Sequence, residues 1–392
     1  MLDNGKAEGV RKIKRFEKYC LKDIATVSQG FTFSRLYQGK KNLKWNYFKV
    51  ADIGLNPNSK YLTNAINTIS DITMEEIGAL PFPKGSIVFP RVGAALFNNN
   101  KKILAQDGVV DDNVLVLTVT DTSKCWYEFL YYYLQGIPLA KWCNSGLVPV
   151  INTKTVLSQM VFLPPLPEQQ KIAAILSTQD KVIELKEKLL VQKQQQKKYL
   201  MQQLLTGKKR LPGFNGEWQF AKLENVSKYS ASAASFKTYE SHLGCGPYPV
   251  YDASGCFGNI DFYENEQPYI SIVKDGAGAG RVALCKEKSS TIGTLGCIFA
   301  NDIDLLYLFY CMSAVDFQIY SNGSTIPHVY YKDYKNMVLY LPCELEQKAI
   351  VEILSAADHE IDLLQKSIEA EKQKKKALMQ LLLTGKVRVK DE

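Results

Sequence analysis

The sequence predicts an α/β or α+β protein in which two similar globular domains alternate with two long helices. Residues 163–210 and 341–388 align without a gap, 178 residues apart, and are identical at half of their positions. Each copy has helical periodicity, whereas the stretches before the copies carry short β-branched and aromatic runs. Duplication of a whole unit predicts a pseudo-twofold symmetric molecule, in which the two helices run antiparallel.

Both repeated segments are typical of long amphipathic helices. Apolar residues recur at alternating steps of four and three, as in a heptad seam. The seam residues are Ile172, Leu176, Ile183, Leu190, Leu200 and Leu204 in the first copy, and Ile350, Leu354, Ile361, Leu364, Ile368, Leu378 and Leu382 in the second. Gly207 and Gly385 stand where a C-terminal helix glycine belongs. We expect two helices of about 40 residues, roughly 60 Å long at 1.5 Å per residue, packed as an antiparallel coiled coil.

Three further features of the helices bear on their packing. Glu168 and Glu346 place a carboxylate near the positive helix end. The middle of each helix is polar, which fits either a solvated stretch or a docking surface. Apolar residues outside the strict seam indicate a wider stripe that also meets another surface. They are Ile175, Val182, Leu189, Ile353 and Leu363.

The segments before the helices are expected to fold mostly as sheet. Strand-like runs occupy 85–89, 114–119 and 269–273, and each segment has one expected helix late in its sequence, at 127–134 and 305–312. The predicted boundaries follow from these patterns. They are 1–162 for the first globular domain, 163–208 for the first long helix, 209–340 for the second globular domain, and 341–392 for the second long helix with its tail.

Composition limits the class of protein. The chain has 392 residues, a net charge of +8 and 46% hydrophobic residues, which indicates a globular protein with a weak preference for an anionic partner. Its nine cysteines form no C-x-x-C pair, which argues against zinc and against a disulfide scaffold. We expect a cytoplasmic protein, because no run is long enough to span a membrane.

Enzyme motifs are missing from the sequence. There is no [DN]-P-P-[FY] run of an amino-methyltransferase and no G-x-x-x-x-G-K-[ST] phosphate loop. The glycine-rich stretch 274–281 leads from one strand-like run into another. We therefore expect a hairpin turn there and not a nucleotide cradle.

The paired Leu-Pro-x(3)-Glu-Gln-x(2)-Ile-x(2)-Ile-Leu-Ser and Leu-Met-Gln-x-Leu-Leu-Thr-Gly-Lys motifs resemble the conserved regions of specificity subunits of type I restriction–modification systems. The resemblance implies that each globular domain reads one half of a split, asymmetric DNA site. It implies that the coiled coil sets the spacing of the half-sites and docks two modification (methyltransferase) subunits. It further implies that S-adenosylmethionine, and ATP with Mg²⁺ for restriction, belong to the modification and restriction subunits. This chain would hold no catalytic residue, cofactor or metal.

Candidate DNA contacts are cationic or amide side chains in polar stretches, since lysine and arginine bind phosphate and asparagine can pair with adenine. In the first domain they are Lys40, Lys41, Lys44, Arg91, Asn98, Asn99, Lys101 and Lys102. In the second domain they are Lys237, Lys274, Arg281, Ser324 and Thr325. Two other functions remain open at this point: a coiled-coil scaffold that does not read DNA, and a stand-alone DNA-modifying enzyme.

Overall fold

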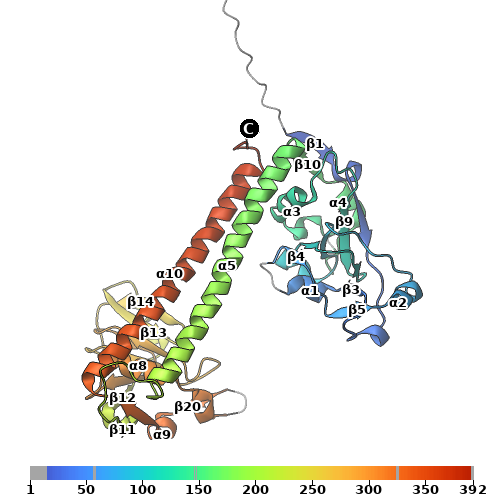
Figure 1. Cartoon of the computed structure of the whole chain (residues 1–392). Coiled ribbons are helices and arrows are strands. Elements are labelled where there is room, and N and C mark those ends of the chain that lie inside the picture. The colour runs from blue at the N-terminus through green and yellow to red at the C-terminus, as the bar shows by residue number, and fades with distance from the viewer. Residues whose placement is uncertain (1–15, 56–58, 145, 147, 324–325, 390–392) are drawn as a thin grey trace, which may run out of the picture. The chain divides into compact units, whose positions relative to one another are not determined.

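The computed structural model describes residues 16–55, 59–144, 146, 148–323 and 326–389. The chain forms two compact units, Met1–Lys188 with Ser367–Glu392, and Leu189–Lys366. Two 39-residue helices, α5 (Leu166–Leu204) and α10 (Glu344–Leu382), pass through both units (Figure 1). Each unit therefore contains one globular domain and half of each long helix. The prediction of two long helices between sheet-containing domains is confirmed.

The first domain is built around a five-stranded sheet in the order β2-β9-β6-β7-β4, with a three-stranded sheet β5-β3-β8 and a two-stranded sheet β1-β10. Its strand β9 begins with an apolar run of four residues that are all buried, as expected for a strand covered on both faces. The strands are β1 (Glu17–Cys20), β2 (Ala25–Gln29), β3 (Trp45–Phe48), β4 (Tyr61–Leu62), β5 (Asn67–Ile69), β6 (Ile87–Pro90), β7 (Lys102–Leu104), β8 (Val109–Val110), β9 (Val114–Val119) and β10 (Met160–Leu163). The helices are α1 (Val50–Gly54), α2 (Asp71–Glu76), α3 (Tyr127–Gln135) and α4 (Thr153–Leu157).

The second domain repeats this arrangement. Its four-stranded sheet β12-β18-β15-β16 corresponds to β2-β9-β6-β7, and its β14-β13-β17 and β11-β21 sheets correspond to β5-β3-β8 and β1-β10. The strands are β11 (Gln219–Lys222), β12 (Ser227–Ala231), β13 (Tyr248–Asp252), β14 (Gly255–Ile260), β15 (Tyr269–Val273), β16 (Val282–Cys285), β17 (Ser290–Thr291), β18 (Leu295–Ala300), β19 (Ser321–Asn322), β20 (His328–Val329) and β21 (Val338–Leu341). The helices are α6 (Leu223–Val226), α7 (Phe236–Glu240), α8 (Leu305–Ser313) and α9 (Tyr331–Tyr334). The glycine-rich stretch joins the antiparallel strands β15 and β16, so the expected hairpin is confirmed.

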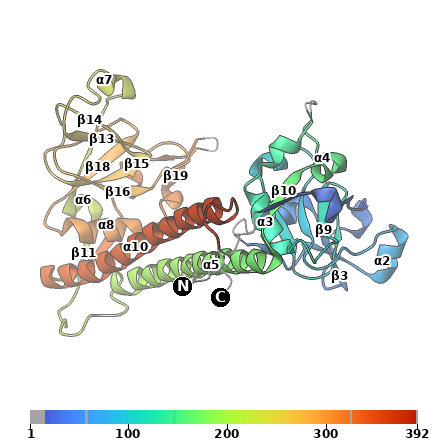
Figure 2. The same ribbon diagram turned by 90° about the horizontal axis from the view of Figure 1, so that it is seen from above.

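The long helices complete the core of each domain. In the first unit, Leu176 near the start of α5 and Leu382 at the end of α10 lie in the cluster formed by the domain core. In the second unit, Leu354 near the start of α10 and Leu204 at the end of α5 do the same. The start of one helix thus lies beside the end of the other, which makes the pair antiparallel (Figures 1 and 2). Burying each such leucine contributes about 1.5–3 kcal/mol.

The predicted seam residues are all buried or half-buried. The helices end as expected, because Gly207 (φ 67°) and Gly385 (φ 71°) adopt the left-handed conformation that follows a helix C-terminus. The middle of the seam, however, is ionic. Lys186 of α5 lies 2.8 Å from Glu371 of α10 in the first unit, and Lys193 of α5 lies 2.7 Å from Glu360 of α10 in the second. The polar mid-section therefore contacts the partner helix and is not simply a solvated stretch.

Candidate nucleic-acid interface

The basic and aromatic residues of the first domain gather in the connection between β2 and β3. Lys40, Lys41 and Lys44 are all exposed. Lys44 lies 2.8 Å from Asp71 and stacks over the Trp45 ring, with its ammonium 5.0 Å from the ring centroid. Lys40 and Lys41 are available to an anionic partner. The connection therefore has the composition of a loop that binds the phosphate backbone of DNA.

Three other candidates of the first domain lie around the end of β6. Arg91 is half-buried and follows β6 directly. Asn98 is exposed at the end of a 3-10 helix, and Asn99 takes the left-handed conformation, with φ 54°. The side-chain carbonyl of Asn99 accepts hydrogen bonds from the Leu139 amide (2.9 Å) and from Lys101 Nζ (2.6 Å). Asn99 therefore supports the fold, and Asn98 is the more exposed of the two amides.

Lys101 and Lys102 do not lie in an exposed loop, and that part of the sequence prediction is wrong. Their relative exposures are 2% and 1%. Lys101 Nζ donates to the carbonyl of Ile137 at 2.9 Å, and Lys102 Nζ donates to the carbonyl of Ser59. Both amines are thus held inside the domain by backbone oxygens, out of reach of a DNA molecule on its surface.

Raising the pH from about 7 to about 9 is expected to stabilise the first unit. Burial lowers the pKa of Lys101 to about 7 and that of Lys102 to about 8. Lysines in the unfolded chain keep a pKa near ~10.4, so the unfolded state binds more protons across this window and the free energy of unfolding rises with pH. Lys101→Met should flatten the rise in urea titrations followed at several pH values. Lys84→Met, which alters an exposed lysine, should leave it unchanged, and an equal rise in all three proteins would contradict the assignment.

In the second domain the turn between β15 and β16 carries two candidates. Lys274 is half-buried, whereas Arg281 is exposed and its guanidinium donates to the carbonyl of Ala253. Gly280 must be glycine, because φ is 88° and an added Cβ would come within 2.4 Å of Phe317 Cβ. This glycine thus serves packing within the domain. Lys237 is exposed on α7, and Ser324 and Thr325 lie outside the described residues.

A polar and aromatic cluster beside this turn had no signal in the sequence. His328 Nδ1 lies 2.7 Å from Asp275 Oδ1, and the His328 ring is parallel to the ring of Tyr330, with centroids 5.9 Å apart. Lys332 Nζ lies 5.5 Å from the centroid of the Tyr330 ring. Asp275 and His328 are 53 residues apart, so only the fold brings them together. Such groups can bind polar base edges or stack on bases.

Two buried carboxylates join the start of each long helix to the segment that follows the other long helix, in equivalent ways. Glu346 accepts two hydrogen bonds of 2.7 Å from the Arg210 guanidinium, and Arg210 lies over the Trp218 ring, 5.3 Å from its centroid. In the first unit Glu168 binds Arg388 in the same way, at 2.8 Å and 2.5 Å. The two glutamates are 178 residues apart, as are the two arginines, and the sequence interpretation did not connect the repeated arginine with the repeated glutamate.

A second repeated contact links each domain to both helices. In the first unit Asp180 of α5 accepts a hydrogen bond of 2.6 Å from the Tyr132 hydroxyl of α3. Lys375 of α10 lies 2.5 Å from the same carboxylate. In the second unit the equivalent residues Tyr310, Asp358 and Lys197 make the same contacts. One carboxylate thus connects three elements in each half of the molecule.

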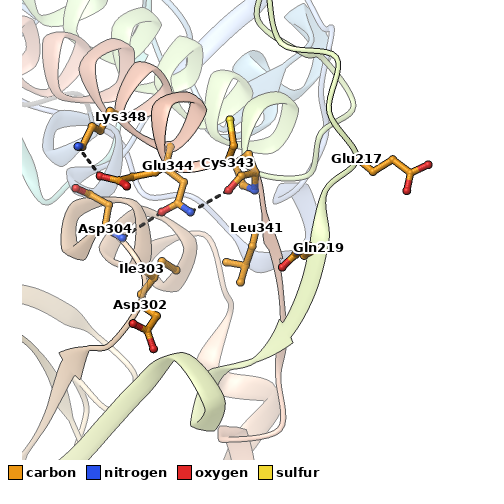
Figure 3. A pocket seen from close by; sticks show the side chains of 11 residues that line it. Glu217, Gln219, Asp302, Ile303, Asp304, Leu341, Cys343, Glu344 and Lys348 are labelled. Carbon is orange, nitrogen blue, oxygen red and sulfur yellow. Dashed lines mark hydrogen bonds and ion pairs between the residues drawn. The ribbon is translucent and has the colours of Figure 1, made fainter.

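A pocket of about 650 Å³ lies where the second domain meets the start of α10. Gln347 accepts a hydrogen bond from the Asp304 amide at 3.1 Å and donates one to the Pro342 carbonyl at 3.0 Å. Figure 3 shows Asp304, Leu341 and Glu344 in the lining of this pocket. In the same view Lys348 lies 2.6 Å from Glu344. Gln169 makes the equivalent contacts at the start of α5, to the amide of Trp126 and the carbonyl of Pro164. The pocket therefore belongs to the attachment of domain to helix.

A metal centre and a membrane-spanning helix are both absent from the residues that the structure describes. Across the described ranges, no three histidine, cysteine, aspartate or glutamate side chains come together as a metal site would require. None of the described helices combines the length and apolar character needed to cross a bilayer. All nine cysteines are free thiols. The candidate contact groups described above are cations, amides and aromatic rings, which can bind phosphates and bases.

Comparisons with known proteins agree on one family. A family model described as the type I restriction modification DNA specificity domain matches residues 13–193 and again 215–372. The Methanocaldococcus jannaschii protein named "Putative type I restriction enzyme MjaX specificity subunit" is 26% identical over 404 residues, covering 94% of this chain and 93% of that protein. The MjaVIII specificity subunit of the same organism is 27% identical over 284 residues, covering 62% and 66%.

Solved structures show the same fold. The S subunit of a type I restriction–modification system from M. genitalium has a TM-score of 0.61 at 13% identity, covering 96% of this chain and 98% of that one. A chain from a study of assembly and conformational transition of the type I system has a TM-score of 0.56, also at 13% identity, covering 95% and 98%. Because the family model covers most of the chain in two copies, the chain belongs to the type I restriction–modification DNA specificity family, as a specificity subunit with two recognition domains.

Proposed function

We propose that each recognition domain reads one half of a two-part, asymmetric DNA sequence, and that the helix pair sets the distance between the halves. The observation that carries this proposal is an uneven repeat. The two units repeat the same contacts between the same residue types, at Glu168 and Glu346 and at Asp180 and Asp358. The candidate DNA-contact groups of the two domains, in contrast, differ. An invariant frame that carries two different surfaces suits a target with two different parts.

The polar surfaces of the domains support DNA as the target. The first domain presents the exposed lysines of the β2–β3 connection, and the second presents Lys237, Arg281 and the Asp275–His328–Tyr330 cluster. Lysine and arginine neutralise phosphates, while aromatic and amide groups contact bases. Binding through such groups weakens as salt rises, because it releases counterions from the duplex.

Two modification subunits would dock on equivalent surfaces of the helices. Ile175 and Ile353 are 38% and 36% exposed, and Leu185 and Leu363 are 53% and 52% exposed. Each pair is related by the 178-residue repeat. Equal exposure of large apolar side chains at equivalent positions fits two copies of one partner. S-adenosylmethionine would be bound by these subunits, and ATP with Mg²⁺ by restriction subunits, with the whole assembly in the cytoplasm.

Footprinting in the presence of the modification subunits tests the proposal. We expect two protected half-sites separated by an unprotected spacer, both lost in high salt. A scaffold that does not read DNA would protect no fixed sequence. The isolated chain should bind no S-adenosylmethionine in calorimetry; stoichiometric binding would favour a stand-alone enzyme instead.

Substituting the repeated apolar residues should remove the modification subunits one at a time. Leu185→Glu should abolish docking at one surface and Leu363→Glu at the other, so that native mass spectrometry shows one bound subunit for each single variant and none for the double variant. Val191→Glu is the matched control, since Val191 is 52% exposed and the equivalent position already holds Glu369. Full docking of the double variant would show that the partner binds elsewhere.

A further inference from the structure

The apolar contacts of the helix pair distinguish α5 from α10 only weakly. Most residues that close the two domain cores are identical in the two helices: Ile172 and Ile350, Leu176 and Leu354, Leu200 and Leu378, Met201 and Met379, Leu204 and Leu382, Leu205 and Leu383. Ala173 and Val351 are the exception among the equivalent residues of these clusters. Two copies of α5 from different chains, or two copies of α10, would bury nearly the same side chains in the same register. Apolar burial therefore permits three pairings, of which the described fold uses one.

The outer ion pairs of the seam cannot distinguish them either. Lys197 lies beside Asp358, and Lys375 lies 2.5 Å from Asp180. Lys197 is equivalent to Lys375, and Asp180 to Asp358. In a pair of α5 helices each Lys197 would meet the Asp180 of the other chain, and a pair of α10 helices would form the matching contacts. These two ion pairs are preserved in every pairing.

The central ion pairs break the symmetry. Glu371 of α10 lies 2.8 Å from Lys186 of α5 and accepts a hydrogen bond of 2.7 Å from Gln179. Lys193 of α5 lies 2.7 Å from Glu360 of α10. Positions 193 and 371 are equivalent in the repeat, yet they carry opposite charges. Each charge has a partner of opposite sign only when α5 faces α10.

Like pairings would place equal charges together. In a pair of α5 helices Lys193 takes the place of Glu371 and faces Lys186 of the other chain, twice by symmetry. In a pair of α10 helices Glu371 takes the place of Lys193 and faces Glu360 of the other chain, again twice. The position equivalent to Lys186 is then Leu364, which offers no cation. Repulsion between charged seam residues is a known means of selecting coiled-coil partners.

We propose that Lys186, Lys193, Glu360 and Glu371 form a pairing code that admits the α5–α10 pair and rejects the α5–α5 and α10–α10 pairs. These charges favour a pair made of one α5 and one α10. They disfavour pairing with the same helix of a second copy of the chain. The charges are well placed to act, because the side chains of Lys186 and Glu371 are only 28% and 19% exposed. The amine of Lys186 and then the amide of Gln179 hold the pKa of Glu371 at about 2.

A nicked form of the full chain tests the code. A protease site placed between Pro212 and Gly213, in the exposed turn after α5, allows the folded protein to be cut into two halves of different mass. After unfolding and joint refolding, native mass spectrometry counts the three pairings. We expect mixed pairs to exceed either like pair by about tenfold or more. A statistical mixture of the three pairings would overturn the proposal.

Exchanging two charges should invert the preference without changing the net charge. In the double variant Lys193→Glu, Glu371→Lys, each like pair gains two attractive contacts, to Lys186 or to Glu360, and the mixed pair gains two repulsive ones. Like pairs should then predominate. The control is Lys198→Glu, Glu352→Lys, which makes the same exchange at exposed positions and should keep mixed pairs. Mixed pairs in both variants would contradict the code.

The intact chain gives an independent readout if the nicked halves do not refold. Glu371→Lys places two cations together at Lys186 and should lower Tm by about 2–4 °C. Adding Lys186→Glu restores an ion pair of reversed polarity and should return Tm towards the wild-type value. An unchanged Tm in the single variant, or no recovery in the double variant, would show that these charges do not select the pairing.

Discussion

Replacing Arg388 with methionine is expected to destabilise the first unit by about 3 kcal/mol, at the lower end of the cost of leaving one partner of a buried ion pair alone. Glu168 is 4% exposed and accepts two charge-assisted hydrogen bonds from the Arg388 guanidinium. Without that cation the Glu168 carboxylate stays buried. Of the described hydrogen bonds that it accepts from residues 388 and 389, only the one from the Val389 amide, at 3.1 Å, remains. Urea unfolding followed by tryptophan fluorescence measures the loss.

Lys386→Met is the matched control for this prediction. It removes the same charge two residues away, from an exposed side chain, and should change the free energy of unfolding by less than about 0.5 kcal/mol. Hydrogen exchange adds a second test, since the loss should be confined to amides of the first unit. Equal effects of Arg388→Met and Lys386→Met would show that the joint does not depend on the ion pair.

Exchanging residues 217–340 for the corresponding segment of another family member is expected to replace one half-site completely. Strand β11 and nearly all of β21, which pair with each other, travel together in this segment. The one residue of β21 outside the segment, Leu341, is identical to its equivalent Leu163. The boundary of the exchanged segment therefore falls where the two repeats have the same sequence. Methylome sequencing of cells that also contain the modification subunits should show one new half-site, one old half-site and the old spacer.

The incoming segment must keep an aromatic residue where Trp218 stands, because Trp218 Nε1 donates to Glu346 at 3.0 Å and its ring lies under Arg210.

The converse experiment is the insertion of one heptad in the middle of both helices, which lengthens each by about 10 Å. That change should alter the spacer and leave both half-sites unchanged. New half-sites after the insertion, or a new spacer after the domain exchange, would contradict the division of labour between helices and domains.

Periodicity predicted the helices well because it depends on one face of a regular element. Strands β9 and β15 were predicted to the residue, since each is a compact, mostly apolar run inside a sheet. The family also followed from the sequence, because the repeated motifs contain both the seam and the joints. These features are local in the chain or repeated along it, and either property can be seen without coordinates.

Tertiary contacts set the limits of the sequence interpretation. Lys101 and Lys102 lie in a run of polar residues, which is typical of an exposed loop. Their amines nevertheless donate hydrogen bonds to backbone carbonyls that are 36 and 43 positions away in the sequence. Glu168 was interpreted only as a favourable charge at a helix N-terminus. Its arginine partner lies 220 residues away, and only the repeat of both residues could have revealed the pair.

The order of synthesis gives the antiparallel helix pair a further consequence. Leu382, the last residue of α10, and Leu383, which follows it, belong to the core of the domain that is made first. At about 5–20 residues per second, the ribosome needs on the order of 10–40 s to advance from the start of α5 to these leucines. The second domain has no such delay, because Met201 and Leu204 are already present when α10 emerges. The domain that is translated first is therefore expected to finish folding last, and loss of the final helical turn should damage the beginning of the protein.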